Sequence, residues 1–171
     1  MNVFFYIAAI VALISSVLTI TRHNAIHALL YLILSLLSIS VIFYLLGAPF
    51  IAALEIIIYA GAIMVLFIFV IMMLNIGMEE KIEKGWMKPR MWILPSILAL
   101  IILIDLVSML YQRSGVEVTG KIISPKQIGL SLFTTYLMVV ELSAILLLAG
   151  IIGAYHLGRQ KKKVIHRYLK D

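Results

Sequence analysis

The chain has 171 residues, of which 64% are hydrophobic, and it carries a formal net charge of +6 and no cysteine. Soluble domains are nearer half apolar, so this composition predicts a membrane protein and leaves no length for a separate soluble domain. The lack of cysteine excludes a disulfide scaffold, a cysteine-bound iron–sulfur cluster and thiol catalysis. Much of the positive charge lies in the tail, which indicates membrane topology and contact with lipid headgroups, not nucleic-acid binding.

Five apolar stretches follow one another along the chain, each near the ~20 residues that a bilayer requires. They predict an all-α membrane protein, a bundle of five transmembrane helices in a single transmembrane domain over residues 1–171. The helices are expected at 2–21, 27–46, 50–75, 91–111 and 135–157, with a basic cytoplasmic tail at 158–171. Asn24 is expected to cap the second helix. Gly47-Ala48-Pro49 predicts a tight antiparallel turn between the second and third helices.

The longer segments between the apolar stretches predict their structure less clearly. Trp86 and Trp92 lie close to the two sides of a charged segment at 78–90, as aromatic residues do at a membrane surface. Residues 116–123 could form a small hairpin, and Ile128 to Phe133 is expected along the membrane interface.

Lysine and arginine predict the orientation, because they concentrate in cytoplasmic segments. With the N-terminus outside, the cytoplasmic segments hold eleven of the 14 basic residues. The outer segments hold only Arg113, Lys121 and Lys126. The sequence therefore predicts an outer N-terminus and a cytoplasmic C-terminus.

The third apolar stretch is the most informative, because it combines an acid, a tyrosine and a run of small residues. Glu55 is followed one helical turn later by Tyr59, which can share its proton, and then by Ala60, Gly61 and Ala62. Twenty-six helical residues would span ~39 Å, against a hydrocarbon core of ~30 Å. Either tilt or a π-bulge near Gly61 could absorb the excess.

Three acids lie within predicted spans: Glu55, Asp105 and Glu141. No lysine or arginine lies inside a span to pair with them, and burial disfavours a charged carboxylate, so we expect at least one to be protonated or to share its proton. Glu55 is either part of a proton path, together with Tyr59, or a protonated carboxyl bonded to a neighbouring helix. Asp105 could reach outward to the interface, and Glu141 could pair across helices.

Other polar residues give a different kind of signal. Tyr31, Ser35 and Ser38 share one helical face, a pattern that usually holds helices together. No histidine pair has metal-ligand spacing with a third ligand, so no metal site is expected. With no phosphate loop, catalytic triad or haem-type histidine pair, the chain is expected to hold no catalytic residue and to bind no redox cofactor alone. It is expected to be one part of a larger assembly.

Two runs carry a family resemblance, residues 24–32 and residues 53–67, with further likeness at 141–150 and 156–159. They closely resemble the family of subunit J of bacterial NADH-quinone oxidoreductase, respiratory complex I, whose mitochondrial counterpart is chain 6 of NADH dehydrogenase. The resemblance covers nearly the whole chain and is weakest at 112–130 and in the tail.

The resemblance implies a non-redox subunit of the proton-pumping membrane arm, in the bacterial inner membrane. Its partners would be lipid, the quinone-cavity subunit and the small acidic subunit beside it, while NADH, FMN, iron–sulfur clusters and quinone would be bound by other subunits. The family's third-helix carboxylate maps onto Glu55, and its π-bulge maps onto Tyr59, Ala60 and Gly61. Conversion of this bulge between π and α forms is proposed to open or close a water path.

Some features depart from the family pattern, and other functions stay open. Ala25 stands where the family often has proline, Asp105 is not part of the pattern, and the tail is unusually basic. The alternatives are the homologous domain of a multisubunit cation/proton antiporter and a small stand-alone proton-coupled exporter. Each would use the same acid chemistry without NADH or quinone.

Overall fold

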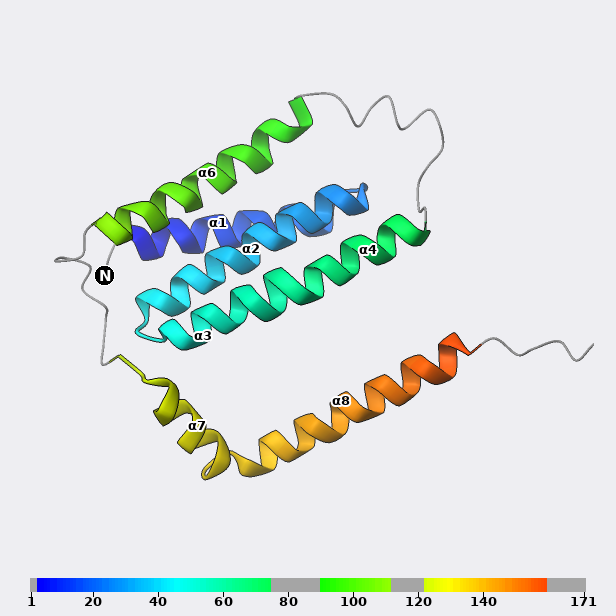
Figure 1. Cartoon of the computed structure of the whole chain (residues 1–171). Coiled ribbons are helices and arrows are strands. Elements are labelled where there is room, and N and C mark those ends of the chain that lie inside the picture. Colours follow the sequence, from blue (N-terminus) through cyan, green and yellow to red (C-terminus); the bar gives the residue numbers. More distant parts are fainter. Residues whose placement is uncertain (1–2, 75–89, 112–121, 160–171) are drawn as a thin grey trace, which may run out of the picture. The chain divides into compact units, whose positions relative to one another are not determined.

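The computed structural model describes residues 3–74, 90–111 and 122–159, and within these ranges it contains helices and no strand (Figure 1). The all-α prediction is therefore confirmed for the described chain. Two units, Met1–Ser124 and Pro125–Asp171, each pack by themselves. The elements are α1 (Val3–Thr21), α2 (Ala25–Leu45), α3 (Pro49–Leu54), the π-helix η1 (Glu55–Ile63), α4 (Met64–Leu74), α6 (Arg90–Tyr111), α7 (Pro125–Phe133) and α8 (Leu137–Gly158).

Four described helices are long and apolar enough to cross a membrane: α1, α2, the continuous helix Pro49–Leu74 and α8. A fifth apolar stretch, Trp92–Ser108, is shorter. The observed helix ends differ from the predicted ones by no more than two residues. The charged segment before Arg90, most of the hairpin expected at 116–123 and the tail after Arg159 lie outside the described residues.

The first turn of α2 is capped as the sequence predicts. The Asn24 side-chain oxygen accepts hydrogen bonds from the backbone N–H groups of Ile26, at 2.9 Å, and His27, at 3.3 Å. These donors have no partner within the helix itself, so the cap stabilises the start of α2. The absence of proline at position 25 does not prevent this helix start.

The end of α2 is closed by a tight turn that sends the chain back as α3. Gly47 has a φ of 85°, a left-handed conformation that glycine adopts without strain. Its N–H donates to the Tyr44 carbonyl at 3.1 Å, and the Ala48 N–H donates to the Phe43 carbonyl at 3.0 Å. This hydrogen-bond pair is a Schellman motif, and Pro49 at the first turn of α3 is compatible with the new helix. The predicted antiparallel arrangement of these two helices is visible in Figure 1.

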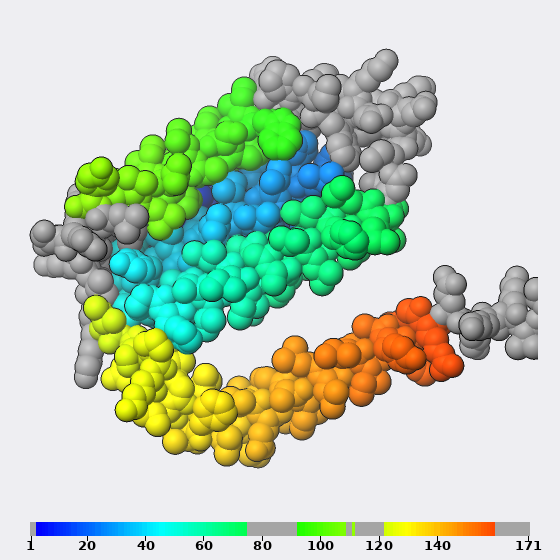
Figure 2. Space-filling view, viewed as in Figure 1, coloured from blue at the N-terminus to red at the C-terminus, as the bar shows by residue number. Residues whose placement is uncertain are grey.

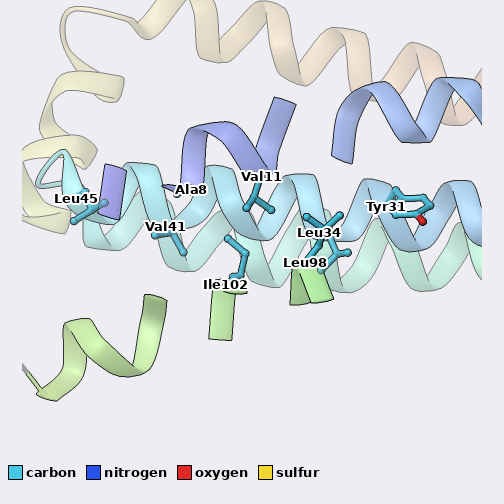
Figure 3. Close-up of a cluster of buried hydrophobic side chains, with 8 residues drawn as sticks. All are labelled: Ala8, Val11, Tyr31, Leu34, Val41, Leu45, Leu98 and Ile102. Carbon is cyan, nitrogen blue, oxygen red and sulfur yellow. The ribbon is translucent and has the colours of Figure 1, made fainter. Parts of the chain in front are cut away.

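The core of the first unit lies around α2, which contacts α1, α3, η1, α4 and α6. Its apolar side chains interlock with those of α1 and α6 (Figure 3). The cluster consists of Ala8, Val11, Tyr31, Leu34, Val41, Leu45, Leu98 and Ile102. Both α6, which contains Asp105, and η1, which contains Glu55 and Tyr59, pack on α2. The helix α2 therefore supports both of these polar regions.

The second unit consists of α7 and α8, joined by a short turn in which the Tyr136 N–H donates to the Ser131 carbonyl at 3.0 Å. The segment Ile128 to Phe133, expected along the membrane interface, belongs to the helix α7, and its place relative to a membrane stays a prediction. No residue of α8 is buried within the described chain.

Candidate functional site: a π-helix in the third apolar segment

The long third helix is not α-helical throughout. Residues Glu55–Ile63 form the π-helix η1, between α3 and α4. At its end the N–H of Met64 is shared between the carbonyls of Gly61 and Tyr59, and the bond to Tyr59, five residues earlier, is of the kind that defines a π turn. The predicted bulge residues, from Tyr59 to Ala62, all lie within η1. π turns are rare inside helices and are frequent at functional sites.

Gly61 lies close to the backbone of the preceding turn. A Cβ atom added there would lie 3.1 Å from the carbonyl oxygen of Ile56, five residues earlier. This carbonyl stands at the π-type acceptor position for residue 61, five residues earlier, and an added Cβ would make a tight contact with it. Glycine avoids this contact, because glycine has no Cβ. The same addition at Gly150 of α8 meets nothing within 4 Å.

Glu55 and Tyr59 are presented outward from η1. Glu55 is half-buried, Tyr59 is 48% exposed, and no residue of η1 is fully buried in the chain. The helix that contains them forms a surface of the first unit (Figure 2). No hydrogen bond joins the Glu55 carboxyl to the Tyr59 hydroxyl in this structure, although both residues are described. A proton passing between them would need an intervening group.

Asp105 lies in a different environment, on α6 where that helix packs on α1 and α2. Its side chain is only 4% exposed, so it is buried and does not reach outward to the interface. Its Oδ2 atom has no hydrogen-bond partner within the described ranges. Since no charged side chain occurs in α1 or α2, the helices that cover it offer no full positive charge except through His27. A buried acid without a partner has a free-energy cost that packing alone does not explain.

Within the first unit, Glu55 and Asp105 are not brought together into one site. They lie on elements that pack against α2 separately, and Glu141 belongs to α8 of the second unit. The hydroxyl of Ser143, near Glu141, donates to the Val139 carbonyl of its own helix at 2.7 Å. Of the three, only Glu55 lies within the π-helix.

Of the polar stripe predicted on α2, Ser35 joins two helices and Ser38 does not, and the sequence analysis missed another serine that does. Ser35 donates to the Ala12 carbonyl of α1 at 3.1 Å, whereas Ser38 donates to Leu34 of its own helix at 2.8 Å. The missed residue is Ser40, which donates to the Ala52 carbonyl of α3 at 2.8 Å. Its only signal in the sequence is a hydroxyl in a mostly apolar helix.

Metal ligands are not clustered in the part of the chain that the structure describes, where no three His, Asp or Glu side chains are placed to hold one ion. The lack of bound cofactors stays a prediction from the sequence.

Comparison with known proteins identifies close relatives. The family described as NADH-ubiquinone/plastoquinone oxidoreductase chain 6 matches residues 15–157. The chain is 52% identical over 163 residues to NADH-quinone oxidoreductase subunit J of Pseudomonas aeruginosa, covering 93% of this chain and 97% of that protein. It is 49% identical over 159 residues to the subunit J of Escherichia coli, covering 92% and 86%. A Buchnera aphidicola subunit J is 45% identical over 163 residues, covering 95% of this chain and 100% of that protein.

Proposed function

The chain belongs to the NADH-ubiquinone/plastoquinone oxidoreductase chain 6 family, and on this premise we propose that it helps to couple quinone reduction to proton translocation in NADH-quinone oxidoreductase. The observation that carries the proposal is the π-helix in a membrane-length segment that also contains an acid. The chain itself contributes no redox step. NADH, FMN, iron–sulfur clusters and quinone are bound by other subunits of the complex.

The proposed arrangement in the membrane is five spans in one transmembrane domain, with the N-terminus outside and the C-terminus in the cytoplasm. Four long apolar helices and the shorter apolar stretch of α6 support the five spans. The distribution of lysine and arginine supports the orientation. With the complex in a bacterial inner membrane, the basic tail faces anionic headgroups on the cytoplasmic side.

The proposed mechanism is a change of register in η1. When one π turn becomes α-helical, the residues on one side of it rotate by about 100°, the angle that one residue occupies in an α-helix. Such a rotation moves Glu55 and Tyr59 relative to α4. Because a proton path needs donors and acceptors within hydrogen-bond distance, the rotation connects or interrupts the path. The acids Asp105 and Glu141 are proposed as secondary protonatable groups.

The proposed partners are the quinone-cavity subunit and the small acidic subunit next to it, which would cover η1. The outward position of Glu55 and Tyr59 supports this, because polar groups in a membrane are normally covered by protein or water.

The proposal is tested by extracting the chain gently from its native membrane and identifying the proteins that copurify by mass spectrometry. We expect flavin- and iron–sulfur-containing subunits that oxidise NADH, together with the membrane subunits named above. Recovery with antiporter subunits, or of the chain alone, would remove NADH and quinone from the account.

Asp105 gives a separate prediction. Asp105→Leu removes a buried carboxyl whose Oδ2 has no hydrogen-bond partner. We therefore expect the complex to assemble, and its free energy of unfolding to stay the same or to rise by up to about 1–3 kcal/mol. We also expect fewer protons translocated per NADH oxidised, because a costly buried acid is retained for its chemistry. Thermal unfolding and proton uptake by vesicles measure the two effects.

The matched control for this prediction is Ser15→Ala. The Ser15 hydroxyl is also buried without a partner in the described chain, but a serine hydroxyl does not ionise at physiological pH. This variant should keep full proton translocation. If Asp105→Leu pumps as well as Ser15→Ala does, Asp105 has no part in proton transfer.

A further inference from the structure

Ser40 makes a hydrogen bond that its own helix does not require. A serine inside a helix can donate to the carbonyl four residues earlier, as Ser38 does to Leu34. Ser40 instead donates across the helix interface to the carbonyl of Ala52, at 2.8 Å. Both residues are buried, at 3% and 4% exposed, so this hydrogen bond is shielded from water and from lipid. It ties α2 to α3.

The acceptor of this bond lies at the junction between α-helix and π-helix. Ala52 is three residues before Glu55, where η1 begins, and the Glu55 N–H is shared between the carbonyls of Ala52 and Ile51. A carbonyl oxygen has two lone pairs. The Ala52 carbonyl can therefore accept from the Ser40 hydroxyl of α2 as well as from the backbone of its own helix, at the last α-helical turn before η1. Moving this turn would require breaking a buried hydrogen bond.

The two ends of η1 therefore differ. On the side of α3, Ala52 is buried and bonded to α2, whereas within η1 no residue is fully buried. On the far side, most side chains of α4 are exposed, and Met64 is its one buried residue. The side chains from Glu55 onward are thus less constrained by this chain than the turn that precedes them.

We propose that Ser40 is a positioning residue that anchors the N-terminal end of the π-helix, so that a change of register in η1 moves the residues after the junction and leaves α3 in place. This inference rests on the proposed function, because it says which side of the π-helix moves when the register of η1 changes. Without the anchor, the extra residue of the π turn could migrate into α3. The rotation of Glu55 and Tyr59 relative to α4 would then be lost.

The test compares four variants in the intact complex: Ser40→Ala, Ser40→Thr, Ser35→Ala and Ser38→Ala. Two quantities are measured, namely hydrogen exchange of peptides covering residues 49–63 and protons translocated per NADH oxidised. Ser40→Ala should make exchange of these peptides roughly five-fold faster, since it removes one buried hydrogen bond. It should also lower the proton ratio, and Ser40→Thr, which keeps the hydroxyl, should restore both.

The controls separate the anchor from a general loss of packing. Ser35→Ala removes a bond between α2 and α1, and Ser38→Ala removes a bond within α2, so neither should change exchange over 49–63. Unchanged exchange in Ser40→Ala would overturn the anchor, whatever the proton ratio. Faster exchange with a normal proton ratio would support the anchor and contradict the proposed role of η1 in coupling.

Discussion

Replacing Gly61 with alanine should shift η1 from the π toward the α register and lower proton translocation, while the same change at Gly150 should have no such effect. The Cβ of residue 61 would lie 3.1 Å from the Ile56 carbonyl oxygen in the π-helix. A contact this short requires the backbone to give way. Alanine also favours a regular α-helix over glycine by about 1 kcal/mol. Both effects favour the α register over the π register.

The expected size of the shift follows from these two effects. A change of about 1–2 kcal/mol alters the ratio of the two registers by roughly 5- to 30-fold. If the complex must pass through the π form in each cycle, NADH–quinone activity and proton translocation should fall together. The register is measured by hydrogen exchange over residues 55–64, since the N–H of Met64 changes its acceptor between the two forms.

Gly61→Leu extends this prediction to a larger side chain. It should block the π form more completely than alanine does and give lower activity. Gly150→Ala is the matched control, because its added Cβ meets nothing within 4 Å in the chain. Full NADH–quinone activity and normal pumping in Gly61→Leu membranes would show that η1 need not change register during turnover.

The position of the π-helix could be predicted from the sequence, but its extent could not. An overlong apolar stretch with Ala60-Gly61-Ala62 at its centre indicates where an extra residue can be accommodated. The nine residues of η1 depend on backbone hydrogen bonds from Glu55 to Met64, which no side-chain pattern reports. By contrast, the Asn24 cap and the turn at Gly47 were predictable, because both use local interactions of particular residue types.

The contacts of α2 and α6 were harder to foresee for a different reason. A helix that is apolar on all sides has no amphipathic pattern to show which face is buried. The sequence therefore could not tell that Asp105 faces α1 and α2, or that Ser40 faces α3 while Ser38 bonds within its own helix. These facts depend on how the helices are rotated against one another, which is set by packing.

Glu55→Gln should keep the complex assembled and lower the number of protons translocated per NADH oxidised. Glutamine has nearly the shape of glutamate and can form hydrogen bonds, but it does not ionise. Glu55 is not part of the buried core of this chain, so the change leaves that core intact. The stoichiometry and pH profile of pumping are the measurements. If both stay normal, Glu55 is structural.

Whether Glu55 and Tyr59 act as one unit is decided by combining Glu55→Gln with Tyr59→Phe. The two side chains are one turn apart, yet no hydrogen bond joins them in the π form. If a register change brings them into contact during turnover, the effects of the two changes on pumping should not add, with a coupling of about 0.5–3 kcal/mol. In the Gly61→Leu background, where η1 is held in the α register, that coupling should differ from its value with Gly61 in place. Additive effects in both backgrounds would mean that the two groups serve the proton path separately, each through its own neighbours.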